Sequence, residues 1–277
     1  ANRDLGWLVG ILIGAMALGS AIPHLFNAFT ILDWRKTIAL ASFTAILGGL
    51  TINLVKLGPQ SKPSTAFQPK IALMSFKDPA LRLANFGYLG HMWELYAMWA
   101  WIGVFLDLSF RLANDFSEPI FTARLVTFLV IGVGGAFGCI IGGYIADRLG
   151  RTAFLIGTMA TSALCALTVG FLFGRDPYLL TIICFIWGIS VVADSAQFSS
   201  SITELAPPGH VGTMLTMQTC GGFLLTLISV HMVPIMSIWF GWERAFMFLA
   251  IGPFLGAFAI SRLRNRPEAR KLANGRR

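Results

Sequence analysis

The chain has 277 residues, of which 56% are hydrophobic and only 12% charged, and its mean hydropathy is +0.71. A soluble domain carries about a quarter charged residues, so this composition excludes an ordinary soluble domain and favours an integral membrane protein. The net charge of +8 is compatible with a nucleic-acid partner, but the basic residues are distributed as in a membrane protein.

Eight apolar segments are long enough to cross a bilayer, which takes roughly 20 residues per helix. They should be helices, because lipid offers the backbone no hydrogen-bond partners. We therefore predict an all-α integral membrane protein with eight transmembrane helices. The segments are residues 5–29, 36–56, 82–108, 119–146, 152–174, 177–203, 211–240 and 243–263.

One long connection divides these segments into two before it and six after it. This linker, residues 57–81, carries four prolines and three lysines. We expect four parts along the chain, namely a first pair of helices (1–56), the linker (57–81), a six-helix unit (82–265) and a basic tail (266–277).

The basic residues predict the orientation. With eight crossings, both termini lie on one side, and that side holds 15 of the 21 lysines and arginines. By the positive-inside rule, both termini are then cytoplasmic. The basic tail would contact anionic lipid, and we expect no nucleic-acid partner.

An internal repeat supports the same division. Residues 32–50 (LDWRKTIALASFTAILGGL) resemble residues 240–258 (FGWERAFMFLAIGPFLGAF), with Trp34 matching Trp242. Transporters are often built from repeated helical units. The first two segments would then be the last two of a six-helix unit, so we expect the chain to be a piece of a longer protein.

Residues 142–152 (GGYIADRLGRT) carry a recognisable motif. It is similar to the signature of the major facilitator superfamily in five positions, which are Gly143, Asp147, Arg148, Gly150 and Arg151; Thr152 replaces a basic residue. The resemblance implies helices five to twelve of a twelve-helix transporter. It also implies that these five residues control conformational gating.

In that family the fifth and eighth helices face each other. The corresponding segments here carry glycines four residues apart, Gly10 with Gly14 and Gly134 with Gly138. Small residues let helices in lipid approach closely, so we predict that Gly10 and Gly14 lie near Gly134 and Gly138. Packing within a single half is the alternative.

Two segments carry acidic residues deep in apolar sequence, with His91 and Glu94 on one and Asp194 on the other. Ionisable groups in a bilayer are costly and usually functional. The resemblance places both segments at the central cavity. We predict that Glu94 and Asp194 open onto a shared cleft, and that His91 pairs with Glu94. Further candidates for binding substrate or protons are Ser190, Gln197, Tyr96 and Trp101.

The alternative for these residues is a structural hydrogen bond between helices.

For the motif, we predict that Asp147 lies close to the start of the first segment, near Arg3 or the amides after it. The amides at a helix start are free and carry a partial positive charge. Arg148 and Arg151 should bond nearby carboxylates or carbonyls. A merely charged turn is the simpler interpretation.

The sequence thus predicts a secondary transporter for a small solute, coupled to protons and working by alternating access. It should use no metal or organic cofactor and act as a monomer at full length in the bacterial cytoplasmic membrane. An anion carrier for nitrate, nitrite or cyanate, or a scaffold or sensor that does not transport, remains an alternative. An intramembrane enzyme is disfavoured, because HMWEL (residues 91–95) lacks the second histidine of a zinc-protease motif.

Overall fold

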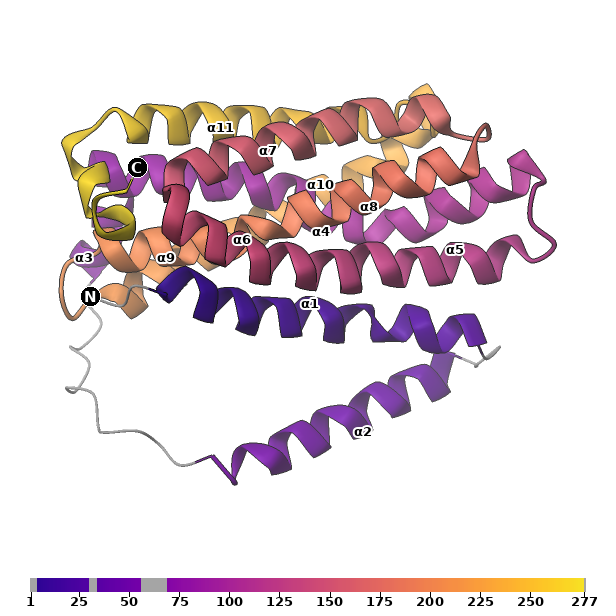
Figure 1. Ribbon diagram of the computed structural model, residues 1–277, viewed down its shortest axis with the longest axis horizontal. Helices are drawn as coiled ribbons and strands as arrows, with labels where there is room; N and C mark the ends of the chain where they lie inside the picture. The colour runs from indigo at the N-terminus through magenta and orange to yellow at the C-terminus, as the bar shows by residue number, and fades with distance from the viewer. Residues whose placement is uncertain (1–3, 30–33, 56–68, 277) are drawn as a thin grey trace.

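The computed structural model describes residues 4–29, 34–55 and 69–276, and the regular elements in these ranges are helices (Figure 1). The helices of the bundle are α1 (Leu5–Phe29), α4 (Pro79–Ala113), α5 (Pro119–Phe128), α6 (Gly135–Leu149), α7 (Arg151–Thr168), α8 (Pro177–Ala193), α9 (Ser195–Leu205), α10 (Val211–Phe240) and α11 (Ile251–Arg264). The other elements are α2 (Trp34–Ile52), α3 (Pro69–Lys77), a π-helical segment (Leu129–Gly134) and the 3-10 segments Val169–Leu172, Met247–Ala250 and Pro267–Gly275.

Seven stretches in the described ranges are long and apolar enough to cross a membrane. They are Leu5–Phe29, Pro79–Ala113, Pro119–Leu149, Arg151–Leu172, Pro177–Leu205, Val211–Phe240 and Met247–Arg264. The predicted span 36–56 forms α2, which is not among the seven, because Arg35 and Lys36 in its first turn lower its hydropathy. An eighth crossing therefore stays a prediction. Residues 57–68 of the predicted linker lie outside the described residues, and its described part contains α3 and the start of α4.

Two of the long helices begin at an Asp-Pro pair. Asp78 Oδ1 accepts hydrogen bonds from the backbone nitrogens of Ala80 and Leu81, at 2.9 and 3.0 Å. Asp176 does the same at the start of α8. An aspartate at the N-cap satisfies amides that have no partner within the helix, and proline fits the first helical position. These pairs explain why α4 and α8 start where they do.

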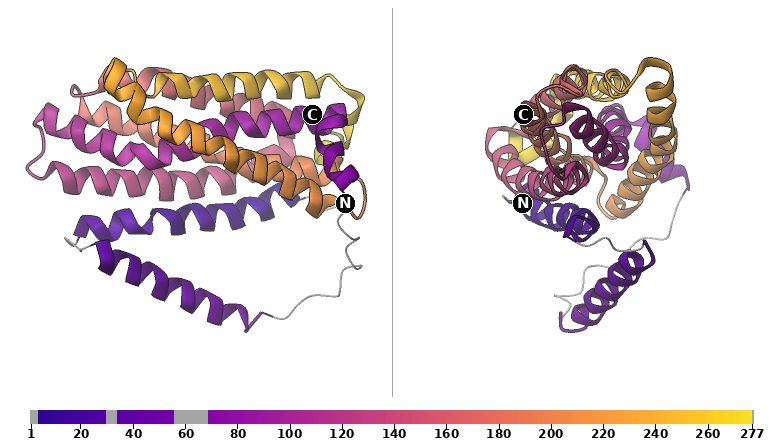
Figure 2. Two further views of the ribbon diagram at one scale, coloured as in Figure 1. Left: turned by 180° about the vertical axis from the view of Figure 1, so that it is seen from behind. Right: turned by 90° about the vertical axis from the view of Figure 1, so that its right-hand side faces the viewer.

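The helices pack around α4, and α1 lies along α5 and α6 (Figure 1). Figure 2 shows α2 standing apart from the bundle, and α2 has no buried residue. The starts of α1 and α4 and the end of α11 lie at the same end of the bundle. We call this the motif end, because residues 142–152 lie there.

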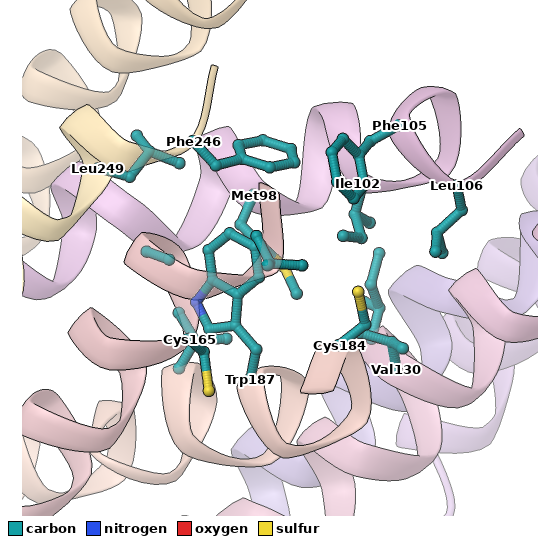
Figure 3. Packing of buried hydrophobic residues seen from close by; sticks show 14 of the residues in the cluster. Met98, Ile102, Phe105, Leu106, Val130, Cys165, Cys184, Trp187, Phe246 and Leu249 are labelled. Carbon is teal, nitrogen blue, oxygen red and sulfur yellow. The ribbon is translucent and has the colours of Figure 1, made fainter. Parts of the chain in front are cut away.

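Aromatic and sulfur-containing side chains fill the core between α4, α7 and α8 (Figure 3). The buried indole ring of Trp187 points toward Phe246 and Met98, and its centroid lies 5.3 Å from that of Phe246. Cys165 and Cys184 are buried in the same cluster. This core fixes α8 against α4, and therefore positions the polar groups that these two helices carry.

Small residues form the interface between α1 and α6. A Cβ added at Gly14 would lie 3.1 Å from the carbonyl oxygen of Ala136, and one added at Gly10 would overlap the carbonyl oxygen of Cys139. The predicted contact of the two helices is confirmed, but the predicted partner glycines are wrong. Gly134 and Gly138 lie against Ile189 of α8 instead. Two faces of α6 carry small residues, and sequence spacing does not tell which one meets α1.

Candidate functional site

The first candidate site is a cluster of ionisable groups buried between α4, α7 and α8. His91 and Asp194 are each 2% exposed, and Glu94 is 1% exposed. His91 Nδ1 lies 2.8 Å from Asp194 Oδ1, and its Nε2 lies 2.9 Å from the hydroxyl of Ser195. This separation places the imidazole and the carboxylate within ion-pair distance. The histidine thus ties α4 to the junction of α8 and α9.

Glu94 has different partners from His91. Its Oε2 accepts a hydrogen bond from Ser162 on α7, and its Oε1 accepts one from the indole nitrogen of Trp187 on α8, both at 2.7 Å. The predicted pair of His91 with Glu94 is therefore wrong, because the two side chains leave α4 toward different helices. The predicted open cleft is not present either, since both carboxylates are enclosed by protein.

Asp194 lies at the junction of α8 and α9. The predicted span 177–203 is confirmed as one membrane-crossing stretch, Pro177–Leu205, in which Asp194 has helical backbone angles and stands between the end of α8 at Ala193 and the start of α9 at Ser195. The carbonyl oxygen of Asp194 accepts from the backbone nitrogens of Gln197 and Phe198, at 2.9 and 3.1 Å.

The other predicted binding residues lie outside this cluster. Trp101 donates its indole N–H to the carbonyl oxygen of Val230, at 2.9 Å, and so joins α4 to α10. The ring of Tyr96 packs against Trp99 and Phe223. The Ser190 hydroxyl bonds within α8, and Gln197 accepts from Arg151 at the motif end. The structure thus gives these four residues packing or bonding partners elsewhere.

The structure adds three residues to the cluster that sequence analysis did not single out as site residues, namely Ser162, Trp187 and Ser195. Trp187 shares the helical spacing of Asp194, which is a weak signal. Ser162 is one of several small polar residues on α7, so its role follows only from the fold.

The second candidate site is at the motif end, where Asp147 meets the start of α1. Its Oδ1 accepts from the backbone nitrogen of Gly6 at 3.2 Å, and its Oδ2 from that of Trp7 at 3.0 Å. The predicted contact is confirmed; Arg3 lies outside the described residues. A carboxylate here satisfies amides that the helix leaves free, and interacts favourably with the helix dipole.

Arg151 is the buried centre of this site. Its Nε and Nη2 donate to the two carboxylate oxygens of Glu204, at 3.0 and 2.8 Å, and Nη2 also lies 3.2 Å from Asp147 Oδ1. It bonds Gln197 as well. The bonds predicted for Arg151 are therefore confirmed, and its paired contact with Glu204 is a strong arrangement for an arginine. Glu204 was not predicted.

The contact that the structure gives for Arg148 is not the predicted bond to a carboxylate or carbonyl. Its guanidinium carbon lies 3.3 Å from the ring centroid of Tyr144, so it stacks on an aromatic ring of its own helix. A cation over an aromatic face is attracted by the ring quadrupole. Arg148 lies on the outer side of α6, whereas Arg151 faces the interior.

Glycine is needed at two positions of the motif, for a different geometric reason at each. Gly150 joins α6 to α7 with a φ of 111°, a conformation that residues with a side chain rarely adopt. Gly143 lies against the backbone of Gly6 and Trp7, so a Cβ there would overlap α1. The first allows the turn, and the second allows Asp147 to reach the amides of α1.

The segment after α11 folds back onto this site. The Arg276 guanidinium donates to the carbonyl oxygen of Asp147 at 3.0 Å, and Glu204 Oε2 accepts from the backbone nitrogen of Ala273 at 3.0 Å. Leu272 and Ala269 of the same segment are fully buried. The tail is therefore part of the motif site, in addition to the lipid contact predicted for it.

Comparison with known proteins agrees with this geometry. Residues 2–230 match the family described as the Major Facilitator Superfamily. The chain belongs to the Major Facilitator Superfamily. It is a multi-pass membrane protein of a family of small-solute transporters, and the relatives that it matches carry the names of transporters.

Three relatives illustrate the similarity. A Staphylococcus haemolyticus protein that carries the name of a proline/betaine transporter is 27% identical over 187 residues, covering 61% of this chain and 38% of its own length. A Caenorhabditis elegans facilitated glucose transporter homolog is 29% identical, covering 53% and 31%. An Escherichia coli inner membrane metabolite transport protein is 24% identical, covering 55% and 38%. The matches thus span less than two fifths of these relatives.

Proposed function

We propose that this chain forms the larger part of a secondary transporter that moves a small solute by alternating access and couples it to protons. The observation that carries the proposal is the buried cluster of Glu94, Asp194 and His91. Ionisable residues inside membrane helices are costly, and they mark substrate or proton pathways by default. Small zwitterions such as proline or betaine are the first candidates to test, given the name of the staphylococcal relative.

The cluster suits proton exchange because its groups connect separate helices. His91 links α4 to the α8–α9 junction, and Glu94 links α4 to α7 and α8. Adding a proton to the His91–Asp194 pair would remove the negative charge that the pair shares. Adding one to Glu94 would turn an acceptor of two hydrogen bonds into a donor. Either change alters how these helices hold together.

In this proposal the motif site controls the opening of one side. The Asp147 contact with Gly6 and Trp7 joins α6 to α1, which belong to different halves of the transporter. The positive-inside rule assigns this end to the cytoplasm of a bacterial inner membrane. The conformation with this contact formed is then closed to the cytoplasm, and transport requires the contact to break and re-form.

The single-sided packing of α1 and α2 supports a longer protein. α2 has no buried residue, and Trp7, Leu8 and Leu12 of α1 are exposed. We infer that four further helices cover these surfaces and complete a twelve-helix monomer. Relatives much longer than the matched segment favour the same inference.

The test is uptake by the full-length protein in liposomes with an imposed pH gradient. Labelled proline, betaine, glucose and nitrate are offered separately, and a protonophore is added in a parallel series. Uptake of one neutral or zwitterionic solute that the protonophore abolishes is the expected result. Nitrate uptake alone would favour the anion carrier, and absence of uptake for the whole panel together with absence of solute-induced proton flux would favour the scaffold.

A further inference from the structure

A groove on the outer surface of the bundle runs between α4, α10 and α11 and begins at the motif end. Its apolar part is a cavity of about 470 Å³ and is lined by residues of all three helices, including Leu83, Phe86, Leu225, Leu255 and Phe258. A second cavity, of about 420 Å³, is lined by Pro79, Arg82, Leu83, Phe258, Arg262, Asn265 and Arg266. Leu83 and Phe258 line both cavities, so the two are parts of one groove.

The charge of the groove changes along its length. Three arginines, Arg82, Arg262 and Arg266, line the part at the motif end. Glu268 lies 3.4 Å from Arg266 Nε and partly compensates the charge of this arginine, whereas the Asp78 carboxylate caps α4. Neither lining contains an aspartate or glutamate. The basic part of the groove is therefore complementary to an anion.

The apolar part faces the surroundings of the bundle. The side chains of Phe86, Leu255 and Phe258 are 47%, 64% and 59% exposed. The guanidinium carbon of Arg262 lies 4.9 Å from the Phe258 ring centroid, where the two parts meet. A ligand that fills the whole groove must be an anion at one end and a hydrocarbon chain along the rest.

We propose that this groove binds an anionic phospholipid, with the phosphate at Arg82, Arg262 and Arg266 and one acyl chain along α4 and α11. Basic pockets between membrane helices bind anionic headgroups, and guanidinium groups bond phosphate with paired N–H donors. A free phosphate would use only the arginines, and a zwitterionic lipid would gain little from their charge. This site is independent of solute transport.

The test is native mass spectrometry of the full-length protein titrated with phosphatidylglycerol, phosphatidylcholine or inorganic phosphate. The variant Arg82→Gln, Arg262→Gln, Arg266→Gln removes the basic end. Its control, Arg111→Gln, Arg175→Gln, Arg244→Gln, removes the same charge from positions that do not line the groove. Each basic residue near a membrane surface contributes about fivefold to anionic binding, so the first variant should weaken phosphatidylglycerol binding roughly 100-fold. The control should change it less than about threefold.

A second measurement uses the unaltered protein, so that it does not depend on the folding of a variant. Phosphatidylglycerol with a photoactivatable acyl chain should label peptides that contain Phe86 and Leu255. Labelling confined to other helices would overturn the proposal. Equal binding of phosphatidylcholine, equal losses in the two variants, or inorganic phosphate competing as well as the lipid would each overturn it too.

Discussion

Glu94 and His91 lie one helical turn apart on α4, yet their side chains bond to different helices. Glu94 holds α7 and α8 through two hydrogen bonds, and His91 holds the start of α9 and Asp194. Buried polar groups are costly when they lose a partner, because nothing else nearby can satisfy the remaining donor or acceptor. A change of protonation at either residue must therefore alter hydrogen bonds to more than one helix.

The first prediction concerns Glu94→Gln. The amide oxygen can still accept from Trp187, so the packing should survive, but the group can no longer take up and release a proton. Proton-driven uptake should fall roughly 100-fold, the lower end of what a positioned proton-transfer group contributes. Exchange of solute across the membrane without a pH gradient should stay within about threefold of the original protein.

The control for this prediction is Asp107→Asn, which neutralises a partly exposed carboxylate on the same helix. It should leave both rates nearly unchanged. If Glu94→Gln depresses uptake and exchange to the same extent, Glu94 binds the solute or supports the fold and does not carry the proton.

The second prediction concerns Asp147→Asn. The amides of Gly6 and Trp7 lie in the first turn of α1 and have no partner within the helix, so their protection depends on this carboxylate. A hydrogen bond to a charged group contributes about 1.5–3 kcal/mol, so these amides should exchange with deuterium roughly 10- to 100-fold faster in the variant. Hydrogen exchange followed by mass spectrometry of the N-terminal peptide measures this.

Arg148→Gln serves as the matched control, because Arg148 belongs to the same motif but stacks on Tyr144. It should leave the exchange of the N-terminal peptide unaltered. Equal rates in Asp147→Asn and in the original protein would show that the motif is only a charged turn.

The sequence predicted single residues well where a helix end dictated the chemistry. Asp147 could be placed because the family resemblance implies that its loop contacts the first segment, and a free helix start attracts a carboxylate. Ser162 and Glu204 could not be placed, because each is the partner of a group far away in sequence, and only the packing of the helices brings the pair together. The same limit explains the wrong pairing of His91 with Glu94.

At the scale of elements, α1 and α6 meet through a line of small residues from Gly6 against Gly143 to Ala21 against Gly132. Their backbones approach closely because few side chains separate them. In lipid such contacts replace the hydrophobic effect as the source of helix association. A second line of glycines, Gly134 at the end of the π-helical segment and Gly138 and Gly142 on α6, faces α8 and α7. α6 is therefore held on two sides by backbone contact.

The third prediction tests this interface with Gly143→Ala. The added methyl group would overlap Gly6 and Trp7, so α1 must move away from α6. Overpacking of this kind costs about 1–3 kcal/mol, and the thermal unfolding midpoint should fall by several degrees. Gly157→Ala on α7 is the matched control, since an added Cβ there meets no atom within 4 Å. Similar midpoints for the two variants would contradict the close approach of α1 and α6.

Sequence spacing identified both small-residue lines as packing faces, but it could not assign their partners. The crossing at 177–203 was predicted as one span and is confirmed, because the residues on both sides of Asp194 suit a continuous helix. The Asp-Pro start of α4 is a local signal that was not used, and the segment was predicted to begin at residue 82 although α4 begins at Pro79. Hydrophobic length therefore predicts a crossing, whereas the exact start of a helix depends on its cap and the partner of each face depends on packing.

At the scale of the whole molecule, the tail after α11 closes the motif end. The Glu204 carboxylate accepts hydrogen bonds from the Arg151 guanidinium and from the backbone nitrogen of Ala273. It therefore links the tail to the start of α7. Residues 266–277 were predicted only as a basic tail that contacts anionic lipid. Their composition gives no hint that Leu272 is buried, because one apolar residue among charged ones is common in any tail.

The fourth prediction concerns Glu204→Gln. The amide cannot accept the paired donors of Arg151 with full charge, so the tail should detach more often. Trypsin should then cleave after Arg270 and Lys271 at least about tenfold faster, since each lost charged hydrogen bond contributes about 1.5–3 kcal/mol. Electrophoresis of timed digests measures the rate. Glu118→Gln, at the exposed start of α5, is the control, and equal cleavage in the two variants would contradict a docked tail.

The docked tail also has a consequence for biosynthesis. Arg276 bonds a carbonyl oxygen that precedes it by 129 residues, and the helices α7 to α11 are all made between the two. At a synthesis rate of about 5–20 residues per second, roughly 6–26 s pass between the synthesis of Asp147 and that of Arg276. During that interval the nascent protein has the contact of Asp147 with α1 but not its support from the tail. Quality-control proteases that inspect newly inserted chains would therefore meet the motif end in its least protected form.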